Sequence, residues 1–165
     1  MNYEALVDEI VAKLQGHVGT LPTASQFDVR AMPDSQKDFA AVTTKTRVTV
    51  AYVGSAYDKP SGTASGAVHQ QEHITLALYV EGRKLRGSGG VYEAIDKVKD
   101  GLLGYKPASG RTRLYISGYG DWTFENNVIG PFLEMTFTGI ASQTLNDQPA
   151  AIGGPLQTTT LTTAP

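Results

Sequence analysis

Five residues in the middle of the chain have the types and the spacing of a zinc-peptidase site. His69-Gln70-Gln71-Glu72-His73 spells H-x-x-E-H, in which the two histidines would hold a zinc ion and the glutamate would activate its bound water. Such a site needs a helix, because only there do positions i and i+4 lie on one face about 6 Å apart. The motif instead leads into the stretch ITLALYV, whose apolar alternation is typical of a strand.

An extended backbone changes what the motif can do. It would separate His69 from His73 by roughly 13 Å, which one zinc ion with bonds of about 2.1 Å cannot bridge. Glu72 would also point to the other face of the strand. We therefore expect no metal and no catalytic residue at this motif, and we interpret it as the solvated entrance to a strand. A zinc-dependent enzyme is the less favoured alternative.

A second candidate is the glycine-rich turn in EGRKLRGSGGVYEAI, which joins a predicted strand to a predicted helix. Backbone N–H groups at a helix N-terminus attract phosphates, and Arg83, Lys84 and Arg86 add positive charge. The turn lacks G-x-x-x-x-G-K-[ST], and Tyr92 stands where G-x-G-x-x-G needs its third glycine. A connection with Ser88 near the helix N-cap explains the glycines. We interpret the basic residues as a surface that meets another protein, with nucleotide binding as the less favoured alternative.

Nucleophilic catalysis finds no support in the sequence. No serine lies in a G-x-S-x-G turn, and the absence of cysteine excludes disulfides, thiolate metal sites and a cysteine nucleophile. Asp121, Glu125 and Glu134 could pair as carboxylates, which the sequence alone does not test. Trp122, the single tryptophan, fits an interface anchor and an ordinary core residue equally well, and we keep it as an interface candidate.

Two amphipathic helices are predicted to position these residues. Apolar side chains recur at three- and four-residue steps from Tyr3 to Leu14, which predicts a helix of about 13 residues that begins at Asn2 and ends near Gly16. The stretch VYEAIDKVKDGLLG has the same periodicity and predicts a second helix with Gly104 as its C-cap.

Strands are predicted between and after the helices. FDVRAMP is a short extended piece, KTRVTVAYVGSAY and HITLALYVEG are strands, and TRLYISGYGDWTFENNVIGPFLEMTFTGIAS contains two strands around a loop. One apolar face is predicted to form the core, and its residues are Val48, Val50, Tyr52, Ile74, Leu76, Leu78, Val80, Leu133, Met135 and Phe137. Strands with one apolar face predict an α+β fold, in which an antiparallel or mixed β-sheet has two amphipathic helices packed on one face.

The composition indicates one ordinary domain over residues 1–142. The formal net charge of −2 gives no basic field for nucleic acid. The N-terminus carries Glu4, Asp8 and Glu9, so it is no signal peptide, and no run approaches the roughly 18 apolar residues of a membrane span. We expect a soluble product made inside the cell.

The end of the chain differs in composition. Residues 142–165 hold one charge, three prolines and few large apolar groups, which is typical of a flexible tail. The stretch LQTTTLTT, however, has the alternating, β-prone character that suits strand addition to a neighbouring sheet. We therefore assign residues 143–165 to an extended C-terminal arm and predict that Leu145 to Pro165 lie on a neighbouring chain, with Leu156 and Leu161 as candidate contacts.

The order of these elements resembles the tail terminator, or tail completion, proteins of Mu-like prophages and contractile-tailed phages. The resemblance rests on the helix YEALVDEIVAKLQ, on RVTVAYVGSAY ending in a polar loop, on HITLALYVEGRKLRGSGGVYEAIDKVKDGLLG, and on the closing GDWTFENNVIGPFLEMTFTGIA. It covers roughly Tyr3 to Ser142 and is one of pattern and order, without a diagnostic motif.

The resemblance implies a structural virion protein without catalytic residues or cofactor. Relatives form a ring, usually hexameric, that caps the finished tail tube, stops its polymerisation and offers a surface to the head–neck connector. In contractile tails the ring also contacts the sheath, and DNA can pass through it without sequence-specific recognition. The implied location is the tail–neck region of the virion, after synthesis in the host bacterial cytoplasm. Another head–tail joining protein of the neck is the alternative reading.

Overall fold

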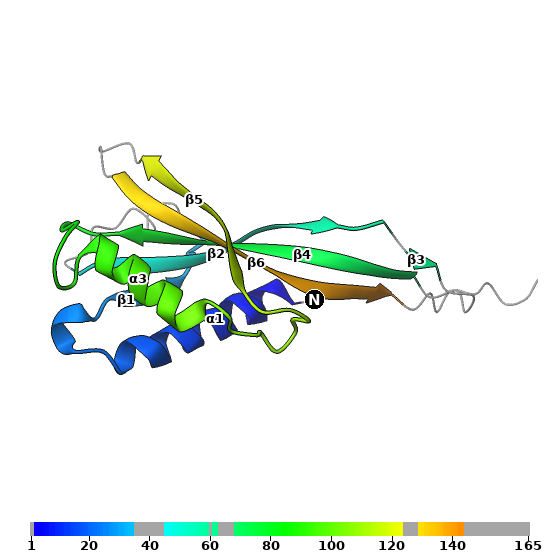
Figure 1. Ribbon diagram of the computed structural model, residues 1–165, viewed down its shortest axis with the longest axis horizontal. Helices are drawn as coiled ribbons and strands as arrows, with labels where there is room; N and C mark the ends of the chain where they lie inside the picture. The colour runs from blue at the N-terminus through cyan, green and yellow to red at the C-terminus, as the bar shows by residue number, and fades with distance from the viewer. Residues whose placement is uncertain (1, 35–44, 60, 63–67, 124–128, 144–165) are drawn as a thin grey trace, which may run out of the picture.

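The computed structural model describes residues 2–34, 45–59, 61–62, 68–123 and 129–143. They form a six-stranded mixed sheet with two helices on one face, which confirms the predicted α+β fold (Figure 1). The strand order is β1-β2-β4-β6-β5, with β3 beside β4; β1 and β2 are parallel and the other pairs are antiparallel. The elements are α1 (Tyr3–Gly19), a short 3-10 turn η1 (Thr23–Ser25), β1 (Asp28–Ala31), β2 (Arg47–Tyr57), β3 (Ser61–Gly62), β4 (Val68–Glu81), α3 (Val91–Leu102), β5 (Tyr115–Thr123) and β6 (Ile129–Gln143).

Helix α1 begins where the sequence predicts and ends later. The Asn2 side chain accepts a hydrogen bond from the Ala5 N–H at 3.2 Å, which confirms the predicted cap. The predicted end near Gly16 is wrong, because the helix continues to Gly19. A glycine inside a helix costs only about 1 kcal/mol relative to alanine. The buried stripe also continues past it to Val18, which is 7% exposed, so packing outweighs that cost.

Helix α3 ends close to its predicted cap. Its C-cap is Leu103, and Gly104 follows with a φ of 79°, the left-handed conformation that glycine adopts without strain. The two helices pack closely, since a Cβ at Gly101 would lie 2.9 Å from the His17 ring.

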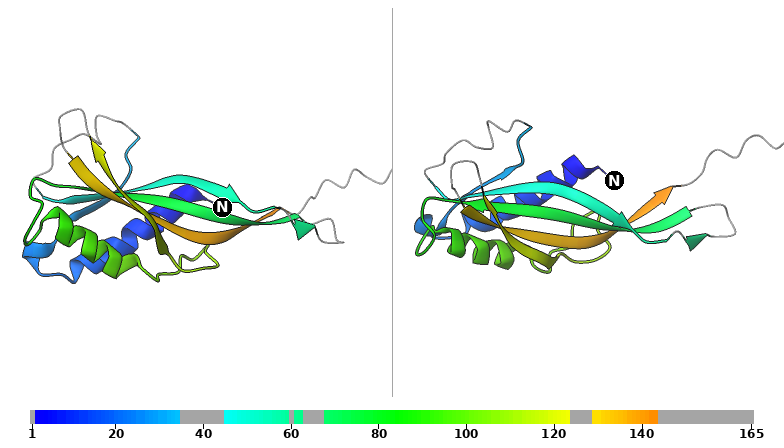
Figure 2. Two further views of the ribbon diagram at one scale, coloured as in Figure 1. Left: turned by 45° about the horizontal axis from the view of Figure 1, so that its top comes forward. Right: turned by 90° about the horizontal axis from the view of Figure 1, so that it is seen from above.

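The core lies between the helices and the central strands, with α1 over β1 and β2 and α3 over β4 and β6 (Figures 1 and 2). The predicted core is confirmed for the side chains that the structure describes, with Tyr52 partly buried. Fully buried members are Val48, Val50, Ile74, Leu76, Leu78, Val80 and Met135. The side chains of Leu133 and Phe137 lie outside the description, although their backbones pair with Leu78 and Ile74.

A bulge in β2 changes which residues face the helices. The pairing with β4 shifts between Tyr52 and Gly54, so Val53 is 54% exposed and the alternation reverses beyond it. Tyr57 therefore pairs with Glu72 on the helix-covered face, where uninterrupted alternation would have turned it to the other side. Beyond the first turn of α1, strands β2, β4 and β6 continue past both helices toward β3 (Figure 1).

Candidate functional site

Glu72, the glutamate of H-x-x-E-H, lies on the helix-covered face of β4 and is only 1% exposed. Its Oε1 accepts hydrogen bonds from the Tyr3 hydroxyl at 2.7 Å and the Tyr57 hydroxyl at 2.9 Å. The Tyr3 ring stacks on Tyr52 with centroids 4.2 Å apart. We call these four residues the tyrosine–glutamate cluster. The expected solvated strand entrance is wrong at Glu72, because this residue shares the phase of the core residue Ile74.

The hydrogen bonds of the cluster shift the ionisation of its members. Burial raises the pKa of the Glu72 carboxyl, but the hydrogen bonds from Tyr3, Ser55 and Tyr57 outweigh burial and leave that pKa below its ordinary value. The hydrogen bond with Tyr57, followed by the one to Glu72, raises the pKa of the Tyr3 hydroxyl. Glu72 is therefore an anion held by hydroxyl donors. Its hydrogen bonds join the first turn of α1 to strands β2 and β4.

The two histidines of the motif lie in β4, which confirms the predicted extended backbone. His73 points to the face opposite Glu72, and its Nε2 is 3.2 Å from Asp58 Oδ1, an ion pair when the ring is protonated. His69 pairs through its backbone with Ser61 of β3 and Ser142 of β6. Among the described residues, no three His, Asp or Glu side chains gather as possible metal ligands.

The loop of residues 82–90 joins β4 to α3 and carries the predicted cations. Arg83, Lys84 and Arg86 are all exposed, and we call this segment the basic loop. Gly89 has a φ of 72°, and a Cβ there would lie 2.8 Å from the Ala24 carbonyl oxygen. The turn and its close approach to η1 therefore require this glycine.

The backbone N–H groups that could cradle a phosphate are already donated within the chain. The Gly90 N–H donates to the Gly87 carbonyl at 2.9 Å, and the Val91 N–H donates to the Lys84 carbonyl at 2.9 Å. The Tyr92 N–H donates to a carbonyl of the same loop at 3.1 Å. The N-terminus of α3 consequently has few donors left for an anion from outside.

Glu93 takes the capping role that the sequence analysis gave to Ser88. The N-cap residue is Gly90, which has no side chain to offer. The Glu93 carboxylate instead accepts hydrogen bonds from the Ser25 hydroxyl at 2.7 Å and the Gly89 N–H at 2.6 Å, and these two bonds lower the pKa of Glu93. A fixed carboxylate at the positive end of the helix occupies the place of a phosphate, which disfavours the nucleotide alternative.

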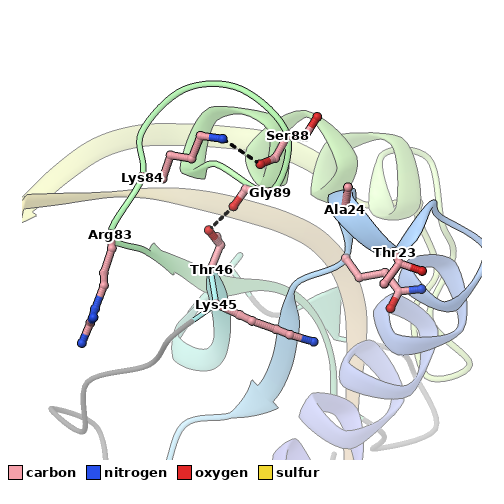
Figure 3. A pocket seen from close by; sticks show the side chains of 9 residues that line it. Thr23, Ala24, Lys45, Thr46, Arg83, Lys84, Ser88 and Gly89 are labelled. Atoms are coloured by element: carbon pink, nitrogen blue, oxygen red, sulfur yellow. Dashed lines mark hydrogen bonds between the residues drawn. The ribbon is translucent and has the colours of Figure 1, made fainter.

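A hollow of about 260 Å³ lies beside the basic loop (Figure 3). Lys45, Arg83 and Lys84 line it, and no carboxylate is among its described lining residues. The Thr46 hydroxyl donates to the Gly89 carbonyl at 2.5 Å, and the Lys84 ammonium donates to another loop carbonyl at 3.3 Å. The Arg83 side chain extends away from these contacts in Figure 3. The loop is held in place while the Arg83 side chain extends away from it (Figure 3), which fits recognition of an acidic surface.

Strand β5, the first of the two strands predicted after the second helix, is the other exposed feature, and the sequence analysis did not single out its exposed side chains. Tyr115, Ile116 and Tyr119 are 47%, 37% and 57% exposed on this edge strand. The backbone of Trp122 lies on the same strand and pairs with Gly130, while its side chain lies outside the description. The spacing of the tyrosines in YISGYG could have indicated that the predicted strand carries an aromatic surface.

Comparison with known proteins places the chain in a family. A family model described as Gp37 protein matches residues 10–147. The chain belongs to the Gp37 family. This is a phage protein family, which confirms the resemblance at that coarser level. No curated protein matches the chain.

The Gp37 match spans the basic loop and strands β4, β5 and β6. Leu156 and Leu161 lie beyond it and outside the described residues, as does most of the arm, so contacts there stay predictions. In the part of this Gp37-family chain that the structure describes, no helix is both long and apolar enough to cross a membrane.

Proposed function

We propose that this Gp37-family chain is a non-enzymatic structural protein of a phage virion. It assembles into a ring of six subunits, and the ring caps the tail tube. The observation that carries the proposal is the phage family match over residues 10–147, and the resemblance of element order to tail terminators gives it its specific form. In this role the ring ends tail polymerisation, contacts the tube and, in a contractile tail, the sheath, and joins the tail to the head–neck connector.

The polar groups that suggested catalysis are hydrogen-bonded within the fold, which supports a non-enzymatic role. The Glu72 carboxylate is engaged by two tyrosine hydroxyls, and the loop N–H groups before α3 are donated to carbonyls and to Glu93. Groups already satisfied within the fold stabilise it and are not poised to act on a substrate.

The exposed strand edges support assembly with other subunits. Among the described residues, β5 has β6 on one side and no strand on the other. Its exposed Tyr115 and Tyr119 belong to a residue type that is enriched at protein interfaces. An unpaired edge with aromatic side chains is a surface that a neighbouring chain can complete.

Deletion of the gene from a phage that encodes it tests the proposal, with the same gene supplied from a plasmid as the control. Electron micrographs of the deletion should show tails of excess and variable length and heads without tails, and the plasmid should restore uniform particles. Tails of normal length joined to heads would overturn the proposal. Tails of normal length beside unattached heads would contradict capping and support the neck-protein alternative.

A further inference from the structure

A second hollow, of about 460 Å³, lies between the first two turns of α1 and strand β2. Strand β1 pairs with β2 only as far as Val50, and the Met32 N–H donates to the Val50 carbonyl at 2.8 Å. Strand β2 continues beyond this point to Tyr57, so the hollow lies where β1 would continue. Its floor is apolar, from Val7, Ala31, Met32 and Val50, and its rim carries Glu4, Asp8 and Asp34. We call it the acidic groove.

The acidic groove and the basic loop both carry unbalanced charge. Glu4, Asp8 and Asp34 are exposed, and no ion pair or hydrogen bond joins their side chains to another described residue. No Lys or Arg is among the described residues that line the groove. The side chains of Arg83 and Arg86 in the basic loop are likewise exposed and without such a partner in the described part of the chain. The two surfaces therefore have opposite charges that their own surroundings do not neutralise.

The two surfaces also match in their apolar parts. Leu85 lies between Lys84 and Arg86 at the loop and is 49% exposed. An apolar side chain flanked by cations is complementary to an apolar floor rimmed by carboxylates, the arrangement in which an anchor is buried and the rim sets orientation.

The positions of the surfaces require a second copy of the chain. The basic loop lies at the end of the sheet where β4 leaves it, whereas the first turns of α1 lie near the middle of the molecule (Figure 1). We infer that the basic loop of one subunit docks in the acidic groove of the next, with Leu85 on the groove floor and the loop cations against Glu4, Asp8 and Asp34. Such a contact uses two different surfaces of one chain, so it is heterologous and closes into a ring when its rotation closes. The inference rests on the proposed ring and names the contact that builds it.

Paired charge reversals test the contact on the full chain. The groove variant Glu4→Lys with Asp8→Lys and the loop variant Arg83→Glu with Arg86→Glu each place like charges against each other. We expect each variant alone to weaken self-association by about ten-fold or more in sedimentation at fixed salt. Reversal of Asp96 and Asp100 to lysine on the exposed face of α3 changes the net charge by the same amount, although it also breaks their ion pairs with Lys99 and Lys97, and it should leave association unchanged.

The decisive sample combines both reversals. A chain with all four substitutions keeps the wild-type net charge and regains complementarity, as does an equimolar mixture of the two paired variants. Both should associate to within about two-fold of wild type, and circular dichroism should show that every variant remains folded at the assay temperature. A Leu85→Ser variant should weaken association in each charge background.

Two outcomes would overturn the inference. Self-association of each paired variant at wild-type strength would mean that the ring closes through other surfaces. If those same variants also failed to attach tails to heads, the two surfaces would bind another virion protein instead. Failure of the four-substitution chain to regain association while it remains folded would also contradict the contact. Failure of the proposed function is a separate result, because tails would then have normal length and join to heads even when the gene is deleted.

Discussion

Replacement of Glu72 by glutamine isolates the charge of the tyrosine–glutamate cluster. The glutamine keeps the shape of the side chain, and its Oε1 can still accept both hydroxyl hydrogen bonds, now as bonds to a neutral acceptor. Hydrogen bonds to charged groups contribute roughly 1.5–3 kcal/mol and neutral ones about 0.5–1.5 kcal/mol. Since Tyr57 is 50% exposed and can turn to water, most of the loss comes from the 2.7 Å bond of Tyr3. We therefore expect Glu72→Gln to lower the free energy of unfolding by about 1–2 kcal/mol at pH 7 and to lower Tm by about 3–6 °C.

The cost should depend on pH in a direction set by the pKa of Glu72. Its folded-state pKa lies below the ordinary value. The carboxylate therefore contributes stability that is present above the unfolded pKa of about 4.3 and is lost as the pH falls through the folded value. Urea unfolding followed by circular dichroism, at one protein concentration, should show the wild-type advantage over Glu72→Gln at pH 7 and a smaller advantage at pH 3.

Controls separate the cluster from a general effect of charge. Glu4→Gln removes an exposed carboxylate without a described hydrogen bond and should change stability by only a few tenths of a kcal/mol, about the size of a helix-dipole contribution. Tyr3→Phe keeps the stack on Tyr52 and should show a coupling of about 1 kcal/mol with Glu72→Gln in a double-mutant cycle. An equal Glu72→Gln cost at pH 7 and pH 3, or zero coupling, would refute the reasoning.

Three further predictions follow from the fold. Leu76→Ala should lower the free energy of unfolding by about 2–5 kcal/mol because Leu76 is fully buried. Thr75→Ala, on the other face of the sheet, should lower it by about 1 kcal/mol or less in the same urea titration. Equal losses would mean that the faces are misassigned. Gly101→Ala should lower Tm despite the higher helix propensity of alanine, because its Cβ would meet the His17 ring at 2.9 Å, and it should raise Tm in a His17→Ala background. Truncation after Ser142 should leave the melting transition unchanged and weaken assembly in sedimentation; an unfolded truncated chain would mean that the arm packs on its own domain.

The helices, the central strands and the core face could be predicted because each rests on periodicity. Leu76 and Val50 alternate with threonine and alanine, and the α1 stripe follows three- and four-residue steps, so burial follows from local pattern. The cap at Asn2 also has a local cause, since its side chain reaches an N–H three residues on.

The departures arise where distant segments decide the outcome. The bulge at Val53 has one weak local signal, the neighbouring Gly54. Nothing nearby in the sequence indicates that the bulge turns Tyr57 toward Glu72. The burial of Glu72 depends on hydroxyls 69 and 15 residues away along the chain. Glu93 displaces Ser88 as the cap because Ser25, 68 residues away, holds its carboxylate. Pairings over such separations are not encoded in the neighbouring residues, so the site chemistry had to come from the structure.

Growth of tail tubes from purified subunits tests the capping role most directly. The purified chain is added to polymerising tail-tube protein, and tube length is followed by electron microscopy against a sample without it. Capping predicts that growth stops after addition and that a ring covers one end of each tube. Tubes that continue to lengthen at an unchanged rate, with bare ends, would contradict it.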